Sequence, residues 1–258
     1  MSSTDPEVLK AAVKIKSLFE DKYHRPRKKA FYIGQLVIDY PLEETAFEKD
    51  SERGYLNLHS YPTRYAKRVD FLYHHKYLGE QMTPRFRAMA KLIDRYSYPD
   101  IADAIGKHLE GLVRAELRAQ GFEIKGVHTN EYQGKKWTRT NHDLDFIAEH
   151  RSQCLKIGVE VKNILSTPER DEIETKIDIC HHLCLTPVFA VRWIKPYVKL
   201  ISDGGGFSWF FKTQIYPPGF EKLVKVVWRR LSLPVNVRTD LPEGSIRVFS
   251  NWVNRQTS

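Results

Sequence analysis

The order of hydrophobic patterns between residues 101 and 193 most constrains what this chain can fold into. Residues 101–120 place apolar side chains at helical spacing and stop before Gly121, a residue that readily ends a helix. Three strands, a second helix and a further strand are expected to follow, over 122–127, 144–149, 155–165, 170–185 and 187–193. This succession of one helix, three strands, a helix and a strand predicts an α/β fold with a mixed sheet flanked by helices.

The flanking segments are less regular. Helical spacing appears over 6–22 and 83–95, whereas 31–70 is rich in tyrosine and charge and is expected to be irregular; a strand is expected within 207–216 and a basic helix over 220–231. We therefore expect a mainly helical N-terminal extension over 1–100, a core over 101–195, and a basic C-terminal α/β extension packed on that core over 196–258.

The composition is that of a globular protein, with 41% hydrophobic and 28% charged residues among 258. No apolar run of about 18 residues occurs, so a membrane-spanning helix is not expected. The first ten residues lack the apolar segment of a secretory signal. Three cysteines cannot build a disulfide framework and suit a reducing compartment, and the expected location is therefore the cytoplasm.

The charge is unevenly distributed along the chain. The formal net charge is +9, made up of +4 over residues 1–100, −2 over 101–180 and +7 over 181–258. Basic surfaces attract polyanions, so the two flanks favour a nucleic-acid partner, while the middle segment carries the carboxylates.

Charged residues of opposite sign lie in the predicted hairpin of 144–149 and 155–165. Glu160 and Lys162 are two apart on one strand and therefore share a face, and Asp145 on the neighbouring strand is at a register that can meet Glu160. Two adjacent carboxylates repel unless a cation lies between them, and Mg²⁺ prefers such hard oxygen ligands. An ammonium beside that metal could stabilise a phosphate oxygen while water attacks.

This pattern resembles the PD-(D/E)xK nuclease superfamily, which has the restriction-endonuclease-like fold. Asp145 corresponds to the strand Asp, and Glu160-Val161-Lys162 to the Glu-x-Lys motif, although Leu144 stands where the family name has Pro. The helix is also similar to that of archaeal Holliday-junction resolvases, with Gly106, Glu110 and Gly121-Phe122 in the same arrangement. The resemblance covers residues 101–195.

The resemblance implies a Mg²⁺-dependent endonuclease, of restriction or repair type, that hydrolyses phosphodiester bonds in double-stranded DNA. Asp145, Glu160 and the carbonyl of Val161 would bind Mg²⁺, with Mn²⁺ as a substitute; Lys162 would position water or stabilise charge; and Glu110 would help to hold a second metal or its waters. The alternatives are a catalytically silent DNA-binding protein of the same fold and an RNA-directed nuclease. A glycine-rich phosphate loop is missing from the sequence, so ATP is not expected.

Several neighbouring residues compete for these roles. Asp143 shares the face of Asp145 and is its alternative as a ligand, while Glu116 competes with Glu110. Lys176, on the following helix, could contact a phosphate or simply be solvated. The cysteines and histidines of 180–184 lack a partner pair at the usual zinc spacing, and we interpret Cys180 and Cys184 as small core residues.

A basic loop precedes Asp145. Lys135, Lys136 and Arg139 surround Trp137, which suits contact with a DNA backbone and stacking on a base, although a polar loop with one anchored Trp has the same pattern. Arg25–Lys29 and Lys222–Arg230 are further basic clusters. We expect the flanking segments to supply DNA recognition and a homodimer contact.

Overall fold

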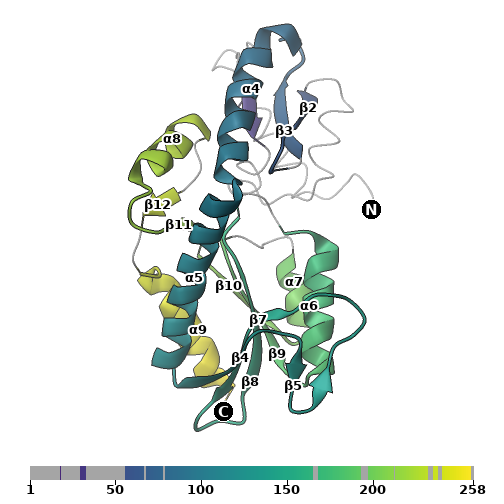
Figure 1. Ribbon diagram of the computed structural model, residues 1–258, viewed down its shortest axis with the longest axis vertical. Coiled ribbons are helices and arrows are strands. Elements are labelled where there is room, and N and C mark those ends of the chain that lie inside the picture. Colours follow the sequence, from purple (N-terminus) through teal and green to yellow (C-terminus); the bar gives the residue numbers. More distant parts are fainter. Residues whose placement is uncertain are drawn as a thin grey trace. The chain divides into compact units, whose positions relative to one another are not determined.

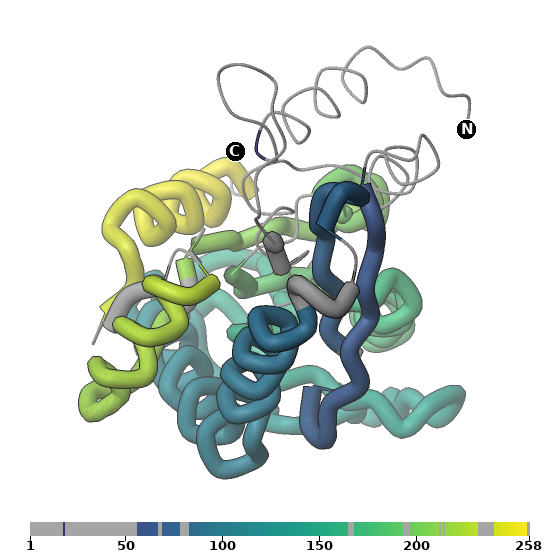
Figure 2. Tube along the Cα trace, turned by 90° about the horizontal axis from the view of Figure 1, so that it is seen from above, coloured from purple at the N-terminus to yellow at the C-terminus, as the bar shows by residue number. Residues whose placement is uncertain are grey.

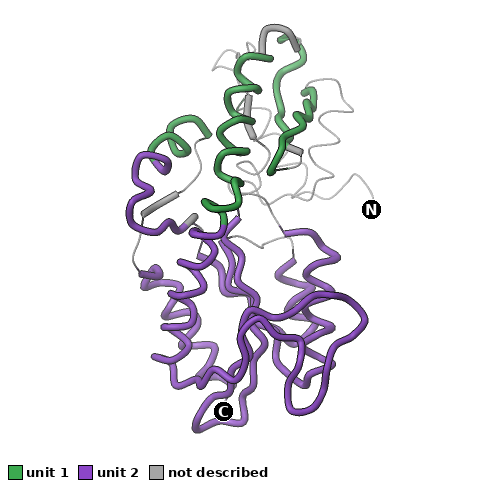
Figure 3. The backbone as a smooth tube through the Cα atoms, in the orientation of Figure 1, with its two compact units in different colours: residues 1–102, 225–233 green, residues 103–224, 234–258 purple. Residues whose placement is uncertain are grey.

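The computed structural model of the 258-residue chain describes Leu18 and residues 30–32, 56–66, 68–77, 79–164, 168–192, 197–211, 213–231, 235–237 and 240–256. The expected helix over 6–22, apart from Leu18, and the basic cluster Arg25–Lys29 lie outside the described residues. The chain divides into two compact units, shown in Figure 3. Unit 1 contains residues 1–102 and 225–233, and unit 2 contains residues 103–224 and 234–258.

Unit 1 combines a small sheet with a helix. Its antiparallel sheet has the order β1-β3-β2, and its elements are β1 (Ala30–Tyr32), β2 (Leu56–Pro62), β3 (Arg68–His74) and α4 (Gly79–Tyr96). Phe86 of α4 stacks on Phe71 of β3 with ring centroids 5.2 Å apart. The helix expected over 83–95 is confirmed. The expectation of an irregular segment is wrong for β2 and β3. After the buried Leu56, half-buried and exposed residues alternate along β2, so that no long apolar run marks this strand.

Unit 2 is built on a five-stranded mixed sheet with the order β10-β9-β8-β7-β4 (Figure 1). Its main elements are α5 (Pro99–Ala119), β4 (Phe122–Thr129), β7 (Leu144–His150), β8 (Lys156–Lys162), α6 (Arg170–His182), β9 (Thr186–Val191), α7 (Val198–Asp203), β10 (Phe207–Phe210) and α9 (Glu243–Arg255). The strands β4, β7 and β8 pair antiparallel, while β8, β9 and β10 pair parallel. The predicted α/β class and the predicted hairpin of β7 and β8 are both confirmed.

Shorter elements connect these. They are the hairpin of β5 (Glu131–Tyr132) and β6 (Lys135–Lys136), the parallel pair β11 (Gln214–Tyr216) and β12 (Val235–Val237), and helix α8 (Glu221–Leu231). The expected strand within 207–216 is two short strands, β10 and β11, and the basic helix over 220–231 is α8. No helix in the described part of the chain has the length and apolar character needed to cross a membrane.

Each face of the unit 2 sheet packs against helices. In the views of Figures 1 and 2, α9 lies on one side of the sheet and α6 on the other. The first face is the larger core, in which side chains of α5 and α9 pack on Phe146, Val159 and Ala190. On the second face, α6 packs on Ile147, Phe189 and their neighbours. Because side chains alternate along a strand, Asp145, Glu160 and Lys162 belong to the face that α6 covers.

Gly158 lets α6 approach β8 closely. A Cβ atom on Gly158 would lie 2.6 Å from Cys180 Sγ and 2.8 Å from Leu144 Cδ1, which is closer than such atoms pack. Cys180 is buried, as expected, whereas the expectation of a core residue is wrong for Cys184, which is exposed beyond the end of α6 with a φ of 58°. The close approach of α6 brings its side chains within reach of Glu160.

We expect Gly158→Ala to destabilise the protein by about 1–3 kcal/mol, the usual cost of overpacking a core. The added methyl group would push α6 away from β8, since Cys180 Sγ is one of the two atoms it meets. Urea unfolding of the variant measures this loss. Cys180→Ala in the same chain should restore part of it, and a double variant no more stable than Gly158→Ala would show that this contact does not limit the approach of α6.

Candidate active site

Two carboxylates lie side by side where β7 and β8 pair. Phe146 pairs with Val159, and this register places Asp145 next to Glu160 on the α6 face. The Val161 N–H donates to Asp145 Oδ2 over 2.6 Å. Glu160 is only 3% exposed. The predicted meeting of Asp145 and Glu160 in the hairpin is confirmed.

The proximity of the two carboxylates alters their protonation. Burial raises the pKa of Glu160 to about 7, with a further contribution from the negative charge of Asp145, and nearby Lys176 and Lys162 oppose the rise. Burial also raises the pKa of Asp145, against the opposing hydrogen bond from Val161 N–H. Both pKa values are therefore raised mainly by burial, although two lysines lie close to Glu160.

Four side chains of alternating charge form a chain across β8 and α6. Glu172 Oε1 lies 2.6 Å from Lys162 Nζ, which lies 3.3 Å from Glu160 Oε1; Lys176 Nζ lies 2.5 Å from Glu160 Oε2. Glu160 and Lys162 are two apart on a strand, and Glu172 and Lys176 are four apart on a helix. Both spacings put the two members of a pair on one face. The helix thus supplies one acid and one base to the strand motif.

Lys162 differs from Lys176 in its access to solvent. The Lys162 side chain is 28% exposed, and that of Lys176 is 7% exposed. Burial would lower the pKa of Lys162, but the charges of Glu160 and Glu172 outweigh it and raise the pKa, so the ammonium persists. Lys162 is therefore a partly exposed, permanently charged group beside two carboxylates.

The end of β8 is held by the residue after Lys162. The Asn163 side chain donates to Ile215 O over 2.6 Å, and the Ile215 N–H donates back to Asn163 Oδ1 over 3.3 Å. This peptide-like pair ties β8 to β11. A site on strands fixed in this way keeps its geometry better than one on loops.

Glu110 reaches the site through a histidine. Glu110 Oε2 lies 3.5 Å from His128 Nε2, and His128 Nδ1 lies 3.6 Å from Asp145 Oδ1. His128, at the end of β4, adopts a φ of 47°. The two competing residues make other contacts. Glu116 accepts a hydrogen bond from the side chain of Gln120, just after the end of α5. The backbone oxygen of Asp143 accepts a hydrogen bond from Lys176 Nζ.

The donor set fits a magnesium ion better than a zinc ion. No cluster of three or more His, Cys, Asp or Glu side chains that could hold a metal ion occurs in the described part of the chain. Zinc sites need three or four protein ligands, whereas Mg²⁺ is held by one or two carboxylates and keeps several waters. Glu160 Oε2 is buried and makes no well-angled hydrogen bond to any described residue; its contact with Lys176 is an ion pair. Asp145, Glu160 and the Val161 carbonyl are compatible with a hydrated Mg²⁺.

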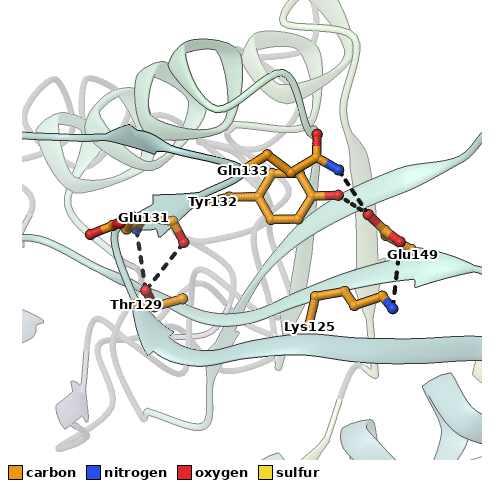
Figure 4. Close-up of a pocket in the computed structure, with 6 residues that line it drawn as sticks. All are labelled: Lys125, Thr129, Glu131, Tyr132, Gln133 and Glu149. Atoms are coloured by element: carbon orange, nitrogen blue, oxygen red, sulfur yellow. Dashed lines mark hydrogen bonds and ion pairs between the residues drawn. The ribbon is translucent and has the colours of Figure 1, made fainter.

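Glu149, further along the same face of β7, is already engaged. It borders a shallow polar hollow of about 630 Å³, with Lys125, Thr129, Glu131, Tyr132 and Gln133 (Figure 4). Its carboxylate accepts hydrogen bonds from the Tyr132 hydroxyl and, over 3.3 Å, from Gln133 Nε2, and it lies 3.7 Å from Lys125 Nζ. These partners separate Glu149 from the pair formed by Asp145 and Glu160.

The basic loop before β7 is partly a structural hairpin. Trp137 is 4% exposed and packs in one cluster with Ile179 of α6 and with Leu183, which follows that helix. Its indole N–H donates to Thr140 Oγ1, so this ring is an anchor and does not present a surface on which a base could stack. Lys135, Lys136 and Arg139 are exposed on the same segment.

Two roles in the site were missed from the sequence. His128 carried no signal, because its position depends on the register of β4 against β7 and on its own backbone conformation. Lys176 did carry one: it lies on the same helical stripe as Ile173, Ile177 and Cys180, which are buried. A lysine inside an apolar stripe indicates a buried partner, and the solvated alternative for Lys176 is wrong.

Comparisons with known proteins assign no family to this chain. No family model, no curated protein and no solved structure matches this chain.

Proposed function

We propose that this protein is a Mg²⁺-dependent endonuclease acting on DNA, with a PD-(D/E)xK core in unit 2. One observation carries the proposal: Asp145 and Glu160 lie side by side on paired strands, with Lys162 on the same face. Two carboxylates can hold a metal ion that activates water, and an ammonium that stays charged can stabilise the negative charge of the transition state in phosphodiester hydrolysis. The mixed sheet with helices on both faces is compatible with such a core.

The position of each residue in the candidate site determines the role proposed for it. Asp145, Glu160 and the Val161 carbonyl would hold the ion, which when bound supplies an activated water and a charge that stabilises the transition state. Lys162, partly exposed, orients the attacking water or neutralises a phosphate oxygen. Glu110, joined to Asp145 through His128, would bind part of the hydration shell or a second ion.

The charge of the protein favours nucleic acid as the substrate. The segments that flank the carboxylates carry net charges of +4 and +7, while the middle segment carries −2. Lys135, Lys136 and Arg139 are exposed beside the strand that carries Asp145 and can contact backbone phosphates. Such contacts provide affinity without choosing a sequence, so the proposal extends to duplex DNA as a class, cut in restriction or repair.

The test is a cleavage assay on supercoiled plasmid, a branched DNA and a matched RNA, each with Mg²⁺, with Mn²⁺ and with EDTA. We expect nicked or linear plasmid in either metal and none in EDTA. Binding that depends on salt without cleavage of any substrate would favour the non-catalytic DNA-binding alternative. Cleavage confined to RNA would favour the RNA-directed nuclease, and the absence of both binding and cleavage would refute the proposal.

A further inference from the structure

Lys176 is a buried cation whose two closest polar partners belong to the candidate site. Its Nζ lies 2.5 Å from Glu160 Oε2 and donates to the backbone oxygen of Asp143 over 2.5 Å. The whole residue is 5% exposed. An ammonium in the interior is costly unless it is paired, so the chain has a physical reason to keep both contacts.

These contacts connect three separate parts of unit 2. Lys176 belongs to α6, Glu160 to β8, and Asp143 directly precedes β7. One ammonium therefore fixes the orientation of the Glu160 carboxylate and the position of the chain two residues before Asp145.

The two lysines of the site have different surroundings. Lys162 is partly exposed and lies closer to Glu172 than to Glu160, at 2.6 Å and 3.3 Å. Lys176 faces the interior and contacts the other oxygen of Glu160. A substrate phosphate can reach the first ammonium, whereas the second acts on the site through Glu160.

We propose that Lys176 is a positioning residue, which holds Glu160 and the start of β7 in the arrangement that binds a divalent cation. This depends on the proposed function for the identity of the ion. The contact itself is independent of any activity and can be tested in metal-free protein.

The first test is a double-mutant cycle on thermal unfolding without metal, with Lys176→Met, Glu160→Gln and the double variant. Lys176→Met alone leaves Glu160 charged and without its closest partner, and we expect the unfolding temperature to fall by on the order of 10 °C. In the Glu160→Gln background the same change removes an ammonium that has lost its carboxylate, and we expect little or no fall. Equal falls in the two backgrounds would overturn the proposal. If Lys176→Met alone does not fold while the double variant does, the coupling is established.

The second test is Mn²⁺ binding measured by calorimetry, which needs no cleavage. Residues that orient a metal ligand typically contribute 10- to 100-fold to metal affinity, and we expect Lys176→Met to weaken Mn²⁺ binding at least about 10-fold. Val253→Ala, which opens a cavity in the opposite core on α9, is the control for lost stability and should leave the affinity unchanged. Unchanged or tighter binding by Lys176→Met would overturn the proposal while the proposed function stands. A native protein that neither binds Mn²⁺ nor cleaves DNA would overturn both.

Discussion

Lys162→Ala is expected to lower the single-turnover rate of DNA cleavage by about 10²–10³-fold, the usual loss when one charged group that stabilises a transition state is removed. Lys162 stays charged because Glu160 and Glu172 outweigh its burial, and part of the side chain is exposed to an incoming phosphate. The rate is measured at saturating enzyme with Mg²⁺, well below the unfolding temperature of the variant, so that chemistry is separated from stability.

The matched control is Lys156→Ala. Lys156 is the first residue of β8, as Lys162 is the last, and the even spacing puts both on one face. The control loses the same charge from the same strand, and its ammonium lies near Gln133 and Tyr132, away from Glu160. We expect less than about a threefold effect, because a charge away from the carboxylates contributes mainly through screened attraction to DNA. Equal losses in the two variants would assign Lys162 to general binding and remove it from the chemistry.

Glu160→Gln is expected to abolish cleavage and yet to stabilise the metal-free protein at pH 8 by about 3 kcal/mol. This figure follows from a pKa raised from 4.5 to about 7, at roughly 1.4 kcal/mol for each pKa unit. The glutamine keeps an oxygen that can accept a hydrogen bond from Lys176, while the buried negative charge is gone. Chemical denaturation of both proteins in EDTA measures the difference.

The sign of the stability change expected for Glu160→Gln follows from how the stability of the native protein depends on pH. The folded protein holds a proton on Glu160 more tightly than the unfolded chain does, so the stability contributed by this group is fully present below about pH 4.5 and is lost as the pH rises to about 7. The advantage of Glu160→Gln should therefore be small at pH 4.5 and reach its full size near pH 7. A variant that is less stable than the native protein at pH 8 would mean that the two lysines more than offset the burial of the charge.

The hairpin and the helices of unit 2 could be predicted from the sequence because each is encoded by local pattern. The β7–β8 pair consists of two mostly buried runs joined by a polar turn, and α5 has an apolar stripe that ends before Gly121, where φ is 88°. The meeting of Asp145 and Glu160 follows from this pairing alone. Position on a strand was therefore enough to predict that the two carboxylates lie side by side.

The rest of the site depends on contacts between elements that are distant in the sequence. The depth of Lys176 depends on how closely α6 approaches β8, which Gly158 decides. The burial of Trp137 depends on the same part of the chain, since the ring packs in one cluster with Ile179 of α6 and with Leu183 just after it. His128 depends on the irregular pairing of β4 after Ile124. The local hydrophobic periodicity of the sequence does not encode these contacts of Lys176, Trp137 and His128.

Residues 196–258 were expected to be an extension packed on the core, and α9 contributes side chains to the core cluster of unit 2. Phe249 stacks on Trp209 with ring centroids 4.3 Å apart, and Trp252 stacks on Phe207 at 4.6 Å. The sequence signal for a helix over 243–255 was overlooked because the segment follows a proline-containing stretch and carries mixed polar residues. An apolar stripe of Ile246, Phe249 and Val253 is nevertheless present.

The place of α9 in the core has a consequence for how the protein is made. A ribosome that has synthesised the chain as far as β10 has already released the strands with Asp145 and Glu160, but Trp209 and Phe207 still lack the rings of α9 that cover them. On the face where α5 packs, the part of the sheet around these two rings is then open to water and to other chains. Unit 2 therefore gains its full stability only when residues 243–255 have left the ribosome.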